Sequence, residues 1–91
     1  MYYVYAIKSL ERVYIYVGMT TNVERRINEH NKGKNRSTKA YKPFDLIYVE
    51  EFDTRIKARQ REKYLKSGIG KEFLKNQKST AAMAKLVDAL L

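Results

Sequence analysis

Two aromatic segments and two amphipathic segments carry the reactive side chains of this 91-residue sequence. The set comprises two phenols, a guanidinium, an imidazole and a lone carboxylate: Tyr5, Tyr16, Arg26, His30 and Glu62. A carboxylate that holds one divalent metal ion, a guanidinium and an oxygen base suffice to break a phosphodiester bond. The cations stabilise charge on the phosphate, and the base activates the nucleophile. These residues are therefore the candidate catalytic set.

Glu62 is the sharpest single signal, because the helical pattern places it on the inward face of a helix. A carboxylate in that position is costly unless something positive binds it. It is interpreted as a ligand for Mg²⁺, which takes oxygen ligands and often only one or two carboxylates. The alternative is an ion pair with Arg25, Arg26 or a lysine.

Arg26 and His30 lie one turn apart on the inward face of another predicted helix. Arg26 suits a bidentate grip on phosphate oxygens, and His30 suits orienting a water molecule or relaying a proton. The alternative is structural, with Arg26 in an ion pair and His30 a hydrogen-bonded residue at the edge of the core.

Tyr5 and Tyr16 fall on adjacent predicted strands, Tyr5 on one face of the first strand and Tyr16 on one face of its partner. A phenol has an ordinary pKa of about 10, so it acts as a base only where cations or a metal-bound water lower that value. Tyrosine is also a common strand and core residue, and that structural interpretation applies to most of the eight tyrosines.

Charge indicates an anionic partner, most plausibly nucleic acid. Nineteen Lys and Arg against ten Asp and Glu give a net charge of +9. No acid occurs between His30 and Asp45, although a solvated basic face is the alternative interpretation. Phosphate contacts are expected from Lys32, Lys34, Arg36, Lys39, Lys42, Arg59 and Lys66. The chain has no cysteine, which excludes disulfides and thiolate zinc sites.

The elements that must position these residues indicate an α+β fold with the order β-β-α-β-α-α. Alternation and turn residues predict strands at 2–7, 13–17 and 44–52, the first two forming a hairpin. The continuously apolar centre of the third strand is typical of a central strand covered on both faces. Capping residues predict helices from Asn22 to about 31, from Asp53 or Thr54 to about 67, and at 70–76.

The chain length predicts one domain, at 1–78. Residues 79–91 are expected to form a C-terminal tail that is helical or disordered. The N-terminus lacks the features of a signal peptide, and no apolar run is long enough to span a bilayer. We therefore expect a cytoplasmic protein with no membrane contact, and a monomer.

The ordered motifs resemble those of the GIY-YIG nuclease superfamily, in particular small UPF0213-like proteins similar to the catalytic domain of the excision-repair nuclease, excinuclease. Tyr3-Val4-Tyr5 matches the first motif and Tyr16-Val17-Gly18 the second. Further matches are Thr20, Glu24–Arg26, Glu29–Asn31, Gly33, Ala58, Arg61–Glu62 and Leu65–Lys66. The resemblance covers roughly residues 2 to 76, and its strength lies in the order and spacing of the whole set.

This resemblance implies a central three-stranded antiparallel sheet flanked by helices, and metal-dependent hydrolysis of DNA in repair or recombination. Tyr16 would be the general base or would orient the nucleophile, with Tyr5 assisting. Arg26 would stabilise the phosphate, His30 would orient water or relay a proton, and Glu62 would hold a single Mg²⁺ or Mn²⁺.

Two positions depart from the family pattern, because Tyr3 replaces the first-motif glycine and Met19 replaces a lysine found in some relatives. A non-catalytic nucleic-acid-binding module on the same scaffold is therefore an alternative. An RNA-directed nuclease is another, since a tyrosine-rich sheet suits stacking of unpaired bases.

Overall fold

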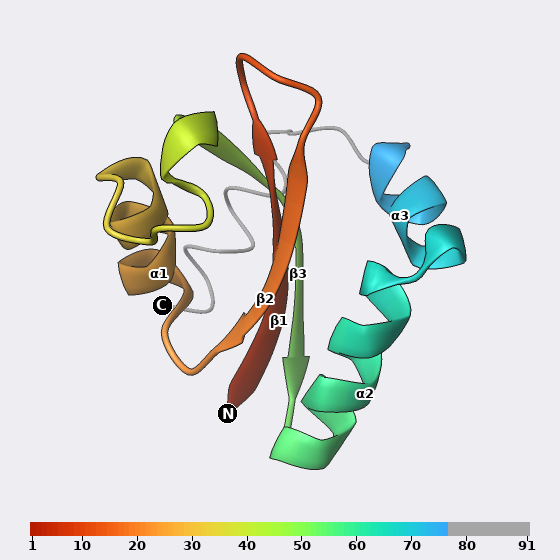
Figure 1. Ribbon diagram of the computed structural model, residues 1–91. Helices are drawn as coiled ribbons and strands as arrows, with labels where there is room; N and C mark the ends of the chain where they lie inside the picture. The colour runs from red at the N-terminus through yellow and green to blue at the C-terminus, as the bar shows by residue number, and fades with distance from the viewer. Residues whose placement is uncertain (77–91) are drawn as a thin grey trace.

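Figure 1 shows the computed structural model, which describes residues 1–76. A three-stranded sheet packs against three helices, so the α+β class and the predicted element order are confirmed. The predicted tail at 79–91 and the last two residues of the predicted domain lie outside the described residues. The elements are β1 (Tyr2–Ser9), β2 (Ile15–Thr20), α1 (Val23–Asn31), a 3₁₀ turn (Lys39–Tyr41), β3 (Phe44–Phe52), α2 (Arg55–Lys66) and α3 (Gly68–Lys75).

The sheet is antiparallel throughout, with the strand order β2-β1-β3. The central strand is therefore β1, whose run Val4–Ile7 is fully buried. The prediction that the third strand is central was wrong, since β3 pairs with β1 alone within residues 1–76. Its apolar run has another cause: β3 contacts α1 on one face and α2 on the other. The apolar run in β3 therefore results from the covering of both faces of the strand, and not from a central position in the sheet.

Helices cover the two faces of the sheet unequally. In Figure 1, α1 lies on one side of the strands, and α2 and α3 lie on the other. Tyr5 and Ile7 of β1 point to the α1 side and pack with Phe44. Val4 and Ala6 point the opposite way, into an aliphatic cluster completed by Val17, Ile47, Ala58, Leu65 and Leu74.

Capping residues set where the helices begin. Asn22 precedes α1, and its side chain accepts a hydrogen bond from the amide of Arg25 at 3.0 Å. Thr54 does the same for α2, so of the two predicted caps the threonine is the one used. Gly33 follows α1 with φ of 76°, the left-handed conformation that glycine adopts freely.

Element ends differ most from prediction at the second strand, which runs 15–20 and not 13–17. Val13, wholly exposed, belongs to the connection between β1 and β2. The third helix begins two residues earlier than predicted, because the Ser67 side chain caps it at Gly70 N. Its Leu74 is buried, whereas Phe73 is 40% exposed. Among residues 1–76, every helix is too short or too polar to cross a bilayer.

Candidate active site

Tyr5 and Gly18 lie opposite each other on β1 and β2, and their pairing creates the floor of the site. The Tyr5 ring crosses the position that a side chain on β2 would occupy. A Cβ on Gly18 would stand 2.6 Å from the Tyr5 hydroxyl oxygen, closer than non-bonded atoms approach. Glycine is therefore required at this position so that the phenol can lie flat against the neighbouring strand.

His30 projects from α1 onto this phenol and is fully buried. Its Nε2 is 2.9 Å from the Tyr5 hydroxyl and its Nδ1 is 2.8 Å from the Thr38 hydroxyl. Both ring nitrogens are thus engaged with protein groups. Of the two predicted roles for His30, direct orientation of water conflicts with this geometry, because neither nitrogen faces solvent. A role exerted through Tyr5 remains the expectation.

Burial governs the protonation of this pair. It raises the pKa of Tyr5 to about 12, the nearby Tyr16 phenol adds to that rise, and the positive charge of Arg26 offsets part of it. Burial also lowers the pKa of His30, and Arg26 lowers it further. At neutral pH the phenol of Tyr5 therefore keeps its proton and the imidazole is uncharged. Tyr5 serves the site as a hydrogen-bonding group and not as a base.

Tyr16 stands at the opening of the same aromatic cluster, on the strand at the sheet edge. Its ring centroid lies 6.2 Å from that of Tyr5 and 4.8 Å from that of His30. Unlike Tyr5 it is only partly buried. Of the two predicted phenols, Tyr16 is thus the more accessible.

Arg26 lies half-buried on α1, one turn before His30. Its Nη1 is 2.8 Å from the Glu29 carboxylate, and its charge acts on the pKa values of both Tyr5 and His30. The contact with Glu29 lowers the pKa of that carboxyl, which stays ionised and steadies the guanidinium. The cation is therefore held beside the two aromatic hydrogen-bonding groups.

Glu62 comes from α2, on the opposite face of the sheet from α1, and is only 6% exposed. Arg59 Nη1 lies 3.0 Å from Oε1 and Lys66 Nζ lies 3.3 Å from Oε2. The carboxylate is therefore bound by something positive, as its buried position required. The ion-pair alternative was right about a lysine, whereas the arginine is Arg59 and neither of the α1 arginines.

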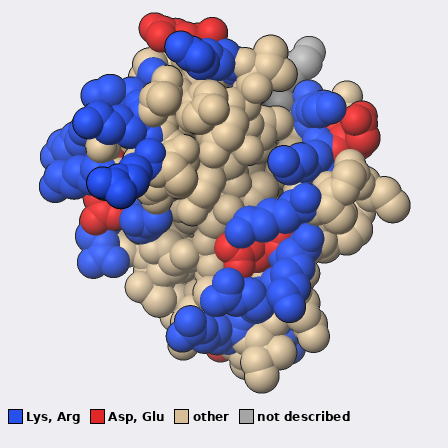
Figure 2. Space-filling view, in the orientation of Figure 1, with Lys and Arg blue, Asp and Glu red and all other residues tan. Residues whose placement is uncertain are grey.

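The edge of β2 connects the two halves of the site. Tyr16, Val17 and Lys66 line one hollow of about 260 Å³ there, so the cation that holds Glu62 also faces the exposed phenol. The negative charge of Glu62 slightly raises the pKa of Tyr5. Figure 2 shows an uncharged band over β2. Basic groups lie on both sides of this band, over α1 and the loop that follows it on one side, and over α2 and α3 on the other.

The chemistry of Glu62 fits a hard divalent cation. It offers oxygen alone, and among residues 1–76 no three His, Cys, Asp or Glu side chains gather as a metal-binding group. A single carboxylate, with water and substrate phosphate completing the coordination, is a set that Mg²⁺ accepts. Arg59 and Lys66 are about half exposed, so both have room to turn from the carboxylate toward a phosphate.

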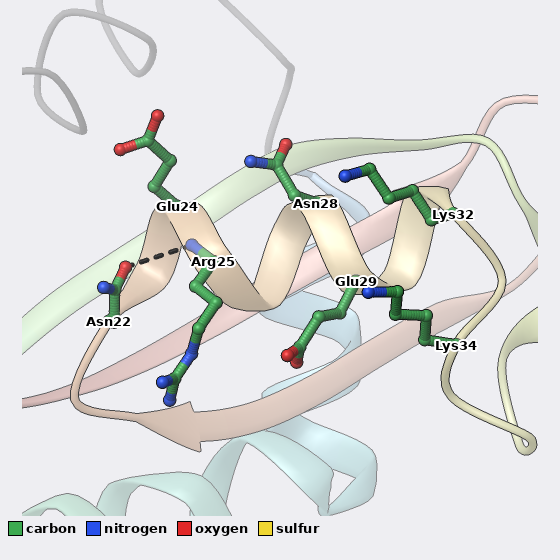
Figure 3. Close-up of a pocket in the computed structure, with 7 residues that line it drawn as sticks. All are labelled: Asn22, Glu24, Arg25, Asn28, Glu29, Lys32 and Lys34. Atoms are coloured by element: carbon green, nitrogen blue, oxygen red, sulfur yellow. Dashed lines mark hydrogen bonds between the residues drawn. The ribbon is translucent and has the colours of Figure 1, made fainter.

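The seven predicted phosphate-binding residues are all exposed, and they fall in separate places. Lys32 and Lys34 line a hollow on the outer side of α1, together with Asn22, Glu24, Arg25, Asn28 and Glu29 (Figure 3). Two carboxylates lie in this hollow, so it is not a purely cationic cradle. Arg59 and Lys66 are engaged with Glu62, and Arg36, Lys39 and Lys42 lie on the loop between α1 and β3.

Sequence reasoning missed three residues that line the site or its edge. Thr38 is fully buried against His30, and only its place in a basic loop with few apolar residues hinted at a special role. Lys71 lines the hollow that contains Tyr16. Lys71 and Lys75 together line a second hollow of about 400 Å³ with Lys8, Val13, Tyr14 and Ile15. Their spacing of four on α3 was the available signal.

Comparison with known proteins agrees with this fold. The model of the GIY-YIG catalytic domain matches residues 1–77. A UPF0213 protein of Staphylococcus haemolyticus is 40% identical over 75 residues, covering 81% of this chain and 90% of that protein. A UPF0213 protein of Natronomonas pharaonis is 40% identical over 67 residues, covering 72% and 78% respectively.

A solved structure supports the same relationship. The solution NMR structure of a UPF0213 protein from Bacillus halodurans superposes with a TM-score of 0.52 at 32% identity, covering 90% of each chain. The names of these three relatives state no activity. The chemistry of the site therefore has to be argued from the catalytic-domain family and from the side chains themselves.

Proposed function

The chain belongs to the GIY-YIG catalytic domain family, and from that premise we propose that it is a divalent-metal-dependent endonuclease that hydrolyses DNA phosphodiesters. One observation carries the proposal. Tyr16 is the accessible phenol beside a buried Tyr5–His30 pair, and it shares a hollow with Lys66, the partner of the buried Glu62. The phenol and the cation thus line one hollow at the edge of β2, and the cation pairs with the buried carboxylate.

The roles follow from exposure and hydrogen bonding. Tyr16 orients or deprotonates the attacking water, because it is the phenol that lies open to the band over β2. Arg26 stabilises the charge that develops on the phosphate oxygens. Tyr5 and His30, both buried and uncharged, lie on the inner side of the site and fix the positions of these groups. A bond forms from the water oxygen to phosphorus, and the bond to the leaving sugar oxygen breaks.

Glu62 would hold the metal, a single Mg²⁺ or Mn²⁺. When bound, such an ion supplies Lewis-acid polarisation of the phosphate and a template for its orientation. Arg59 and Lys66 neutralise the carboxylate when no metal is bound, and they lie within reach of phosphate oxygens when one is. The free-energy cost of burying the Glu62 carboxylate is thereby offset both with and without a bound metal ion.

The charge distribution supports a path for DNA across β2. Basic groups flank the uncharged band on both sides (Figure 2), and a duplex or strand laid over it meets cations along each backbone. Such contacts position a substrate without reading its sequence. The setting that fits is repair or recombination, in which DNA structure or a partner protein supplies specificity to a monomeric cytoplasmic enzyme.

The test is cleavage of plasmid and branched DNA in Mg²⁺, Mn²⁺ or EDTA, with RNA as a parallel substrate. Glu62→Gln and Tyr16→Phe keep the shape of each side chain and remove its chemistry. Glu51→Gln and Tyr64→Phe, both at exposed positions, are the matched controls. DNA binding is measured in EDTA by fluorescence anisotropy for every variant.

We expect cleavage only with metal, a loss of at least about 100-fold in both site variants, and full activity in both controls. Binding should persist in Tyr16→Phe. Binding without cleavage under every condition would favour the non-catalytic module, and cleavage confined to RNA would favour the RNA-directed nuclease. Full activity in Glu62→Gln would refute the metal assignment.

A further inference from the structure

Thr38 is a fully buried polar residue in the otherwise basic, solvent-facing segment between α1 and β3. A local turn holds it there: its amide donates to the Asn35 carbonyl at 3.2 Å, and its hydroxyl lies 3.5 Å from the same carbonyl oxygen. The hydroxyl oxygen is 2.8 Å from Nδ1 of His30. Thr38 is thus the outer end of a buried chain that passes through the imidazole to Tyr5.

The chain of hydrogen bonds admits two directions for its protons. In the first, Tyr5 donates to Nε2, Nδ1–H donates to Thr38, and Thr38 donates to the Asn35 carbonyl. In the second, Thr38 donates to Nδ1 and Nε2–H donates to Tyr5. The second direction leaves the proton of the Tyr5 hydroxyl without an acceptor, because among residues 1–76 His30 offers the one acceptor atom within hydrogen-bond distance.

A buried donor without an acceptor is costly, so the first direction is the stable one. Electrostatics favour the same direction. Arg26 acts on the pKa of Tyr5 as a cation, and a guanidinium has no acceptor atoms. The Tyr5 oxygen must therefore turn its lone pairs to Arg26 and its proton away from it, toward His30.

We propose that Thr38 is a positioning residue that locks His30 in the neutral Nδ1–H tautomer. The lock makes Tyr5 a donor to Nε2 and turns the lone pairs of its oxygen toward Arg26, the residue that the proposed function assigns to the phosphate. The effect on cleavage rests on the proposed function, whereas the tautomer is a property of the folded protein alone.

The chain contains a single histidine, so ¹⁵N-detected NMR reports its tautomer without assignment ambiguity. The variants are Thr38→Val, which keeps the shape and removes the hydroxyl, and Thr38→Ser, which keeps the hydroxyl. We expect Nδ1–H in the natural protein and in Thr38→Ser. In Thr38→Val each tautomer leaves one buried donor without an acceptor, either Nδ1–H or the Tyr5 hydroxyl, so we expect Nδ1–H to lose its preference and Nε2–H to become populated.

Cleavage in Mg²⁺ should fall at least about tenfold in Thr38→Val and stay within about threefold in Thr38→Ser. A natural protein with Nε2–H, or an unchanged tautomer in Thr38→Val, would overturn the proposal. If Thr38→Val does not fold, the spectra of the natural protein and Thr38→Ser decide the question. Absence of cleavage in the natural protein would count against the nuclease, while the tautomer would still be read.

Discussion

The two faces of β1 differ in what holds them together. Towards α2, Val4 and Ala6 pack into a cluster of aliphatic side chains. Towards α1, Tyr5 meets His30 through a hydrogen bond at 2.9 Å and aromatic contacts. Alternation along one strand therefore gives a face stabilised by apolar packing and a face built from directed polar contacts.

The difference shows how a domain of this size combines stability with chemistry. Apolar packing is non-directional and tolerates exchange of similar volumes, so the α2 face gives stability without constraining geometry. Hydrogen bonds fail when one partner is lost, so the α1 face is fixed in geometry and sensitive to single atoms. We therefore expect substitutions on the two faces to have different effects. We also expect different responses to a change of pH and to the loss of surface charge.

The largest effect on stability is expected from Leu65→Ala in the aliphatic cluster. Leu65 is fully buried, and truncation leaves a cavity, so the free energy of unfolding should fall by about 2–5 kcal/mol. Denaturant titration measures this. Leu10→Ala, at a position 58% exposed, should change stability by less than about 0.5 kcal/mol. Equal losses in both would show that the cluster is not the main core.

Tyr5→Phe tests the other face and removes one oxygen atom. His30 Nε2 loses its donor, so the expected loss of stability is about 1–3 kcal/mol, with cleavage reduced far more than folding. Unfolding and cleavage are measured on the same preparation. Tyr64→Phe, at an exposed ring, serves as the control. A variant with normal cleavage would show that the buried phenol does not support the site.

Acidification should weaken the protein through His30. The pKa of His30 is lowered in the folded state, so below its ordinary value of about 6.5 the unfolded chain binds the proton more readily. Stability is full above that pH and falls as the pH decreases, by at most about 1.4 kcal/mol per unit.

Unfolding titrations from about pH 7.5 to about pH 5, the range in which an imidazole changes its charge, measure this fall. The pKa of Glu29 is also lowered, but its contribution is lost only below the ordinary carboxyl range and so does not overlap. Direct NMR titration of the single histidine is the control. A ring that gains its proton above its ordinary pKa would reverse the sign.

The smallest effect on stability is expected from Lys71→Ala with Lys75→Ala, because both positions are exposed and should cost less than about 0.5 kcal/mol. DNA affinity should nevertheless fall, since both residues line the hollow beside β2. The salt dependence should flatten by about 0.9 per lost phosphate contact. Lys57→Ala with Lys63→Ala, which line other hollows on α2, is the matched control. Equal losses in both pairs would mean that charge alone matters.

Some features of the site were readable from the sequence. Helical spacing put Arg26, His30 and Glu62 inward, and the burial of His30 and Glu62 agrees with that prediction. Alternation assigned Tyr5 and Tyr16 each to one face of its own strand, and the structure shows that their rings lie together. The predicted roles of these residues stay predictions, since side-chain placement does not establish catalysis.

Other features depended on contacts between distant segments. The hydrogen bond of Thr38 to His30 closes a loop whose conformation no local pattern specifies. The pairing of Glu62 with Arg59 and Lys66, and not with the α1 arginines, required knowing that α1 and α2 cover opposite faces.

Local sequence patterns specified which side chains turn inward, because periodicity and caps act over a few neighbouring residues. The order of the motifs also specified the family. The folded arrangement was needed to establish that β1 is the central strand, that β2 lies at the edge of the sheet, and that Tyr5 is fully buried while Tyr16 is partly exposed. Those outcomes depend on strand order and on which helix covers which face, and residues far apart in the chain set both.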